Sequence, residues 1–296
     1  MTTRRKFIRT SSYMAAGAMV APMAACSSKP GAEKAESAAK EMITEIVSKE
    51  MGVQAYSVRD ALSEDFAGTM KKIADIGYKF IEAYDLKLDG TMYGMKPSEY
   101  KKIVDDLGME VIASHSTYFT PDQAQPVIEA SQEAGIKYLV IPYLNNEYRE
   151  DYRKIADNLN AVGELFKDSG IKFGYHNHAF EFEKTADGEI PMEIMLNETQ
   201  PDLVFFEADL YWVKKGGYDP LAFLQKFPGR FPLFHVKDAG ENLDQVTLGE
   251  GIIDFQAIFD DKDTAGLEYY FVEDEQTNDP LGNLKKAYDH INTLKF

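Results

Sequence analysis

The sequence predicts an α/β protein, a (β/α)8 barrel in a single domain. Much of that prediction rests on a short sequence pattern that repeats along the chain. A helix-ending glycine followed by a short apolar run recurs along the chain, with the glycines at Gly77, Gly108, Gly135, Gly170 and Gly266. Glycine suits the left-handed residue that ends a helix, and the apolar run suits a buried parallel strand. The first four glycines lie 31, 27 and 35 residues apart, which is the length of one strand with its crossover helix.

The remaining elements follow from apolar segments and helical periodicity. Eight segments are expected to be strands, near residues 53–57, 80–84, 111–115, 138–142, 172–178, 203–209, 232–237 and 269–273. Amphipathic helices are expected over residues 100–107, 152–166 and 281–291, where apolar residues recur at helical spacing. Eight such units in about 250 residues match the size of a closed barrel. The alternative is an open doubly wound sheet, but no Gly-x-Gly-x-x-Gly motif follows the first strand.

The composition argues against several classes of protein. The 296 residues include 32 Lys and Arg against 49 Asp and Glu, a net charge of −17 that disfavours a nucleic-acid partner. The 44% of hydrophobic residues is enough for a large core. The lone cysteine, Cys26, leaves no intramolecular disulfide and no cysteine-based zinc site. No apolar run reaches the roughly 20 residues of a membrane-spanning helix.

Residues 1–25 resemble an export signal. Arg4 and Arg5 precede an apolar stretch and a pair of alanines, as in a twin-arginine signal, and Cys26 stands where a lipoprotein is lipidated. We therefore expect residues 26–46 to be a flexible tether and residues 47–296 to be the barrel. The expected location is periplasmic or membrane-anchored, with membrane contact only through a lipid on Cys26. The alternative is a disordered basic tail with a buried cysteine.

Polar side chains gather where the predicted strands end, which is where barrel enzymes place their chemistry. Four of the five histidines fall there: His115, His176, His178 and His235. One residue from each of four neighbouring strands is expected to bind one divalent cation: His176, Asp209, His235 and Glu273. Two imidazoles and two carboxylates suit such an ion. A hydrogen-bonded polar cluster without metal is the alternative.

These strand endings resemble those of the xylose-isomerase-like TIM-barrel family, the sugar phosphate isomerase/epimerase group that includes tagatose epimerases and inosose dehydratases. The resemblance covers roughly residues 48–296, and its most specific motifs are at residues 175–182, 209–212, 235–238 and 272–273. It implies one metal ligand from each of the fifth to eighth strands. His176 stands where the family usually has a glutamate, so acid and base would come from other residues: Glu273, His178, Lys237, His115 and Glu82.

The resemblance implies a divalent-metal-dependent isomerase or epimerase. It would remove a proton beside the carbonyl of a small carbohydrate, an unphosphorylated keto-sugar or polyol, with Mn²⁺ favoured over Co²⁺, Zn²⁺ or Mg²⁺. The first alternative is a lyase or dehydratase that eliminates a β-substituent from a 3-keto-glycoside or an inosose. The second is a sugar-binding lipoprotein without catalysis. The residues predict no oligomeric state.

Further residues near the strand ends are weaker candidates. Six aromatic residues could line a sugar site: Tyr56, Tyr118, Phe119, Tyr143, Tyr211 and Trp212. Glu82 would contact a substrate hydroxyl or pair with Lys237. Arg59 follows the carboxyl end of the first predicted strand. Residues 248–255 are glycine-rich, but Glu250 would repel a phosphate, so we expect this loop to shape a sugar pocket. Xylose isomerase itself needs two metal sites, and the sequence indicates ligands for one.

Overall fold

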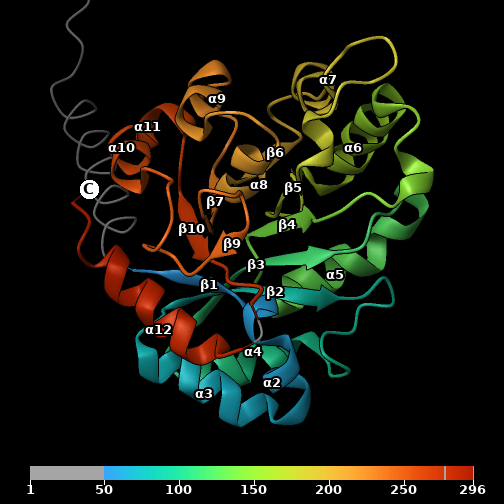
Figure 1. Ribbon diagram of the computed structural model, residues 1–296. Helices are drawn as coiled ribbons and strands as arrows, with labels where there is room; N and C mark the ends of the chain where they lie inside the picture. The colour runs from blue at the N-terminus through green and yellow to red at the C-terminus, as the bar shows by residue number, and fades with distance from the viewer. Residues whose placement is uncertain (1–49, 277, 296) are drawn as a thin grey trace, which may run out of the picture. The chain divides into compact units, whose positions relative to one another are not determined.

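The structure is a computed structural model that describes residues 50–276 and 278–295. Eight parallel strands close into a barrel in the order β1-β10-β7-β6-β5-β4-β3-β2, which confirms the predicted fold (Figure 1). They are β1 (Gly52–Gln54), β2 (Phe80–Leu86), β3 (Glu110–Ser116), β4 (Tyr138–Ile141), β5 (Lys172–His176), β6 (Phe205–Asp209), β7 (Leu233–Val236) and β10 (Tyr269–Val272). The predicted export signal (1–25), Cys26 and the tether (26–46) lie outside the described residues.

Helices follow the strands and surround the barrel (Figure 1). They are α2 (Arg59–Glu64), α3 (Phe66–Ile76), α4 (Pro97–Asp106), α5 (Ala124–Ala134), α6 (Tyr152–Phe166), α7 (Pro191–Glu198), α8 (Leu210–Lys215), α9 (Pro220–Lys226), α10 (Phe255–Asp260), α11 (Lys262–Ala265) and α12 (Pro280–Ile291). Single 3₁₀ turns lie at residues 55–58, 121–123, 146–148 and 180–182. The three helices predicted from periodicity correspond to α4, α6 and α12.

The repeated glycines do what the sequence predicts. Gly135 and Gly266 end α5 and α11 with φ of 74° and 81°. Gly77, Gly108 and Gly170 also have positive φ, which a residue with a Cβ adopts at a cost. The chain can therefore turn sharply from each helix into the next strand.

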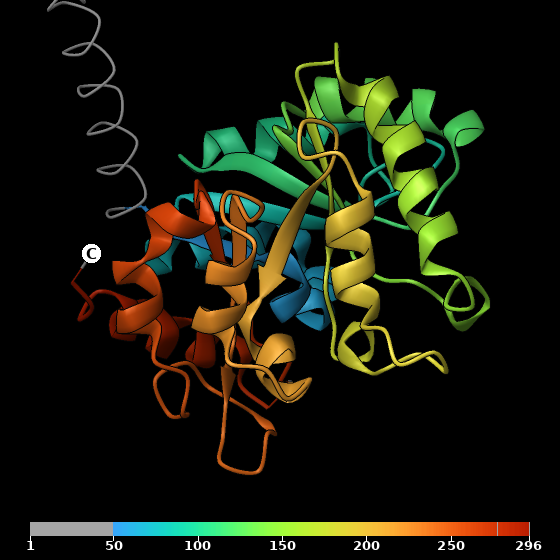
Figure 2. The ribbon, with the colours of Figure 1, turned by 90° about the horizontal axis from the view of Figure 1, so that it is seen from above.

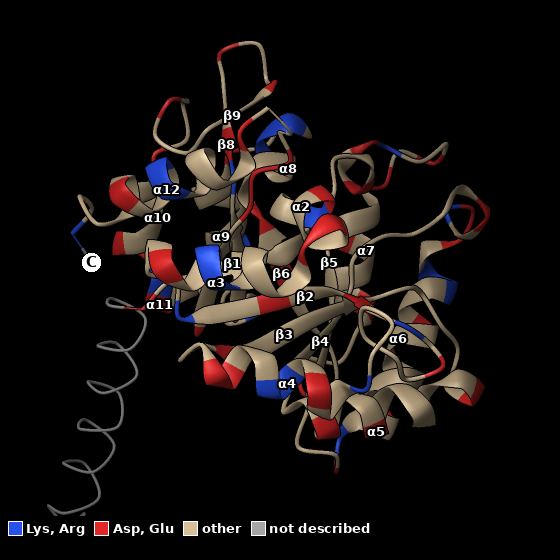
Figure 3. Ribbon diagram, turned by 90° about the horizontal axis from the view of Figure 1, so that it is seen from below, with Lys and Arg blue, Asp and Glu red and all other residues tan. Residues whose placement is uncertain are grey.

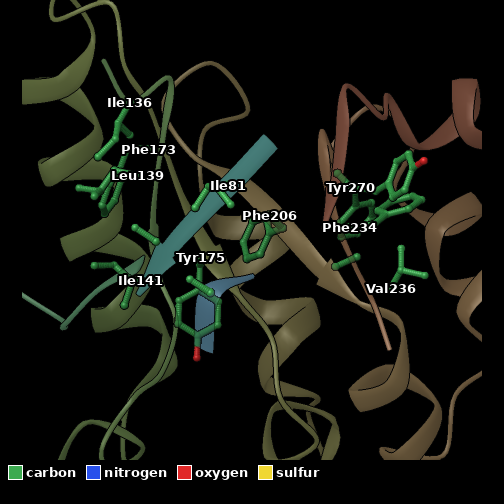
Figure 4. Close-up of a cluster of buried hydrophobic side chains, with 14 of the residues drawn as sticks. Ile81, Ile136, Leu139, Ile141, Phe173, Tyr175, Phe206, Phe234, Val236 and Tyr270 are labelled. Carbon is green, nitrogen blue, oxygen red and sulfur yellow. The ribbon is translucent and has the colours of Figure 1, made fainter. Parts of the chain in front are cut away.

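Strand residues alternate between two apolar environments. Outward-facing side chains pack in the large cluster that joins the barrel to the helices, among them Leu139, Phe206 and Val236 (Figure 4). A separate cluster contains Phe80, Phe205 and Phe271 with residues of neighbouring strands. Because side chains alternate along a strand, we place this second cluster inside the barrel. It fills the interior near the strand starts.

Charged residues lie mainly on the outer helices and loops (Figure 3). After β7 the chain forms a two-stranded hairpin, β8 (Asp238–Ala239) and β9 (Gln245–Val246), which is the orange projection in Figure 2. Among the helices of the described residues, none is both long and apolar enough to cross a bilayer.

Candidate metal centre

The barrel interior becomes polar toward the carboxyl ends of the strands. On β6 the inward face reads Phe205, then Glu207, then Asp209, because every second residue points the same way. The two carboxylates are fully buried, whereas Phe205 belongs to the interior apolar cluster. Each step of two residues climbs roughly 6–7 Å along the strand. The strands therefore carry an apolar layer below and polar layers above.

The structure brings together the four residues that the sequence predicts as metal ligands. Their ligand atoms all lie within 4.8 Å of one another, and all four residues are buried. We call this group the outer cluster: His176, Asp209, His235 and Glu273. The side chains come from β5, β6 and β7 and from the residue after β10. Closure of the barrel explains the convergence, since β6 lies between β5 and β7 and β7 lies beside β10.

Two atoms of the outer cluster are arranged as a cation would need them. His176 Nδ1 lies 3.2 Å from the carbonyl oxygen of Pro142, which can only accept, so we assign the proton to Nδ1. The lone pair on Nε2 then faces Asp209 Oδ2 at 3.4 Å. Neither atom has a hydrogen bond, although Lys237 Nζ forms an ion pair with Asp209 Oδ2 at 3.0 Å. Two facing acceptors repel each other unless a positive charge lies between them. Ligands around a tetrahedral ion with bonds of about 2.1 Å are separated by roughly 3.4 Å.

Asp209 is held in place by its neighbours. Its Oδ1 accepts a hydrogen bond from the backbone N–H of Trp212 at 2.9 Å, so it caps α8. Asn177 exchanges hydrogen bonds with the backbone N–H and carbonyl of Asp209, at 3.1 and 3.3 Å. Burial would raise the pKa of Asp209, but the Lys237 ammonium outweighs it and holds this pKa well below its usual range. The carboxylate is thus ionised and fixed in orientation.

Lys237 and His235 carry the positive charge of the centre. Lys237 Nζ is buried and lies 3.0 Å from Asp209 Oδ2, 2.7 Å from Glu273 Oε2 and 2.6 Å from Glu275 Oε1. Burial disfavours its charge, but these carboxylates raise the pKa of Lys237 well above its usual value. Burial would also lower the pKa of His235, yet the surrounding carboxylates, Glu207 foremost, raise it well above its usual value. Burial would raise the pKa of Glu273, but Lys237 lowers it below its ordinary value.

A second group of ligand-type side chains lies in the deeper polar layer. This inner cluster, Glu82, His115, Glu207 and His235, also has its ligand atoms within 4.8 Å of one another. His115 Nε2 lies 2.9 Å from Glu207 Oε2, and His235 Nε2 lies 2.5 Å from Glu82 Oε2. Burial and the Glu207 carboxylate raise the pKa of Glu82 to about 8. The sequence indicates ligands for one cation, whereas the structure shows a second candidate group.

A cavity of about 290 Å³ opens above the outer cluster. Four of the predicted catalytic residues line it: His115, His178, Lys237 and Glu273. Glu82 lies below it, fully buried. A larger hollow of about 480 Å³ lies at the other end of the strands, around Pro232 and Glu268. Neither ligand cluster includes residues of that hollow, so the chemistry belongs to the smaller cavity.

The aromatic predictions are partly wrong. Tyr56 and Tyr143 line the cavity, together with Tyr84, which was not predicted. Phe119 is buried against Phe166 and Phe173 in the outer core. The other three predicted aromatics are not among the lining residues either: Tyr118, Tyr211 and Trp212. The Trp212 ring nevertheless lies beside the site, with its centroid 5.1 Å from that of His178 and 5.4 Å from Lys237 Nζ.

Two polar predictions are also corrected. Glu82 pairs with His235 and accepts a hydrogen bond from Gln54 at 2.8 Å, whereas Lys237 pairs with other carboxylates. The loop at residues 248–255 is not among the cavity-lining residues. Asp238 binds it instead, because its carboxylate accepts hydrogen bonds from the backbone N–H groups of residues 249, 251 and 253 at 3.0, 3.0 and 3.3 Å. Arg59 lies outside the outer cluster and donates a hydrogen bond to the backbone carbonyl of Tyr56.

Sequence reasoning missed four residues that the structure places in or beside the site: Gln54, Asn177, Glu207 and Glu275. Glu207 could have been found, because it shares a strand face with Asp209 by the two-residue period. Glu275 lines the cavity, but it lies in a loop where periodicity gives no signal. Gln54 and Asn177 act through hydrogen bonds to other residues, and no spacing in the sequence reveals such a partner.

Glu181 provides a prediction on stability. It is fully buried, accepts hydrogen bonds from Tyr175 and from the backbone of His178, and burial raises its pKa to about 7. Folding disfavours the ionised form of Glu181. The stabilising contribution of this carboxyl to the free energy of unfolding is therefore full below about pH 4.5 and is lost by about pH 7. In the metal-free protein, the free energy of unfolding of Glu181→Gln should therefore rise relative to that of wild type as the pH increases from 4.5 to 8, by up to roughly 3 kcal/mol. Urea unfolding measures this, and Glu147→Gln, on an exposed carboxylate, should show no such trend.

Comparisons with known proteins agree with this architecture. The family described as "Xylose isomerase-like TIM barrel" matches residues 70–294. A sugar phosphate isomerase/epimerase from Parabacteroides distasonis has a TM-score of 0.73 and 28% identity, over 82% of this chain and 93% of that one. Inosose dehydratases from Clostridium beijerinckii and Clostridium perfringens are 27% and 24% identical, over 48% and 57% of this chain. The matches span 52% and 63% of those two relatives, about half to under two thirds of their length. This chain belongs to the xylose isomerase-like TIM-barrel family.

Proposed function

We propose that this protein is a divalent-metal-dependent isomerase or epimerase of an unphosphorylated keto-sugar or polyol. One observation carries the proposal: His176 Nε2 and Asp209 Oδ2 face each other without hydrogen bonds, beneath an open cavity. Lys237 compensates the charge of Asp209, but the lone pair of His176 Nε2 has no donor, and a bound cation would satisfy it. The outer cluster would hold it, and a bound divalent ion supplies polarisation of a substrate carbonyl.

The cavity wall provides distinct roles for its other side chains. Lys237 keeps its proton, so it suits stabilisation of negative charge on a substrate oxygen rather than proton removal. Burial, with His176 beside it, lowers the pKa of His178 to about 2, so His178 stays neutral and serves as a hydrogen-bonding group. Proton removal beside the carbonyl then belongs to the other proton acceptors that line the cavity: His115, Glu273 and Glu275.

Two features support a substrate without phosphate. Lys237, the basic residue of the cavity wall, is already paired with three carboxylates. The backbone amides of the glycine-rich loop donate to Asp238, so they are engaged within the protein. A phosphate entering the cavity would meet Glu273 and Glu275.

A lyase or dehydratase is the second candidate. The relatives named inosose dehydratase favour it, and so does His176, an imidazole at a position where the resemblance implies a glutamate for proton exchange. Removal of the same proton can be followed by loss of a β-substituent instead of reprotonation. The same cavity residues would serve both reactions.

Incubation in deuterated water separates these reactions. The Mn²⁺-loaded protein is given free ketoses, inososes and a 3-keto-glucoside, and the products are followed by NMR, with metal-stripped protein as the matched control. We expect deuterium in an intact sugar, formed only when metal is bound. Loss of water or release of the aglycone would establish the lyase, and sugar binding without turnover would establish a non-catalytic sugar-binding protein.

We also propose that the protein is exported and lipidated on Cys26, on the strength of the signal-like residues 1–25. Mass spectrometry of the protein from its native membrane fraction tests this. We expect a chain that begins at Cys26 and carries acyl groups. A chain that retains Arg4 and Arg5 would contradict the proposal.

A further inference from the structure

Two carboxylate oxygens of the inner cluster have no hydrogen-bond partner in the protein. Glu82 Oε2 accepts from Gln54 and His235, and Glu207 Oε2 is 2.9 Å from His115 Nε2. The second carboxylate oxygen of each, Glu82 Oε1 and Glu207 Oε1, has no hydrogen bond. Both residues have 0% exposure. Unpaired buried carboxylate oxygens are costly, and a bound cation is one way to satisfy them.

Two separations in the inner cluster match the spacing between ligands of one ion. His115 Nε2 is 3.4 Å from Glu82 Oε1, and His235 Nε2 is 3.3 Å from Glu207 Oε2. These separations resemble those in the outer cluster, and ligand atoms around a common ion lie roughly 3.0–3.4 Å apart. Both nitrogens of His235 face ligand groups, since Nδ1 lies 3.0 Å from Glu273 Oε2. His235 could therefore serve both clusters.

The charge of the centre points the same way. The Lys237 ammonium lies beside the carboxylates of the outer cluster, Asp209 and Glu273. Among the ion pairs of the described residues, those of Glu82 and Glu207 are to the imidazoles of His115 and His235. The two deeper carboxylates therefore lack a lysine or arginine partner in those pairs. Isolated buried charges are strongly disfavoured.

We propose that the inner cluster is a second divalent-cation site, stacked beneath the outer one, and that His235 bridges the two sites as an imidazolate whose ring proton is released to solvent when the metals bind. Two imidazoles and two carboxylates suit Mn²⁺, Co²⁺ or Zn²⁺ rather than Ca²⁺, which takes oxygen ligands. Glu82, Glu207 and His235 are fully buried, and His115 is the inner-cluster residue that lines the cavity, whereas His176 and Glu273 of the outer cluster both line it. The inner ion would therefore exchange slowly and would organise the floor of the centre. This goes beyond the proposed function, which needs the outer ion alone; with His115 bound to the inner ion, proton removal would belong to Glu273 and Glu275.

Metal stoichiometry tests the second site. The purified protein is stripped with a chelator, dialysed against Mn²⁺ or Zn²⁺, desalted and analysed by mass spectrometry of its metals. We expect two equivalents in wild type and one in Glu207→Gln, which removes an inner ligand charge at nearly constant volume. His176→Ala should also bind one equivalent, because it spares the inner cluster. Chelator should remove the two wild-type ions at different rates.

The matched control is Glu181→Gln, which removes a buried carboxylate that belongs to neither cluster and should leave two equivalents. His115→Asn serves as a second inner variant if Glu207→Gln fails to fold, and it too should bind one equivalent. One equivalent in wild type, unchanged in the folded inner variant, would overturn the second site and leave the proposed function standing. No bound metal in wild type would overturn both.

Discussion

Replacing His235 by alanine should abolish most of the turnover, a loss of about 10³-fold. His235 belongs to both clusters, and electrophilic stabilisation by a bound cation is worth several kcal/mol. The same change removes the imidazole that lies among Glu82, Glu207 and Glu273. Steady-state kinetics with the substrate that the deuterium experiment yields, together with the metal content of the variant, measures the effect.

The control for this substitution is His290→Ala, in α12, which lies outside both clusters. It should keep both turnover and metal. His235→Gln provides a second variant that retains a polar side chain if the alanine variant fails to fold. A folded His235 variant that kept wild-type metal content and turnover would show that the cluster does not hold the catalytic ion.

Replacing Lys237 by methionine should destabilise the metal-free protein by about 3–5 kcal/mol. The ammonium is buried against Asp209 and Glu273, and its removal leaves carboxylates without their cation. Mn²⁺ should restore part of the loss, because it neutralises the same carboxylates. Urea unfolding with and without Mn²⁺ gives both quantities.

Lys71→Met is the matched control. Lys71 forms an exposed ion pair with Asp75 on α3, each side chain about 62% exposed, so its loss should cost under about 1 kcal/mol. Equal unfolding free energies for the two variants would contradict the assignment of Lys237 as the buried counter-charge of the centre.

Much of the fold can be read from the sequence because the barrel repeats a local rule. Each helix must end and each strand must be apolar, so glycines such as Gly135 mark the units without any knowledge of distant contacts. The outer-cluster residues were predictable for a related reason. A parallel barrel brings all its strand ends to one rim, so polar residues at those ends must converge.

The remaining features depend on contacts that no local pattern specifies. Glu207 lies two residues before Asp209 on β6 and therefore deeper in the barrel. Its place in a ligand cluster depends on β2 and β3, which bring Glu82 and His115 close to it. Phe119 follows a strand end like Tyr143 does, yet it turns into the outer core while Tyr143 faces the cavity. That difference arises from how the loops fold back over the barrel.

The most direct test of the central claim is anomalous diffraction from crystals soaked in Mn²⁺. We expect a peak at the manganese absorption edge about 2.0–2.3 Å from His176 Nε2 and Asp209 Oδ2, the two facing atoms that lack hydrogen bonds. Clear density for those side chains, with no anomalous peak between them at saturating Mn²⁺, would contradict the claim that this barrel binds a catalytic cation.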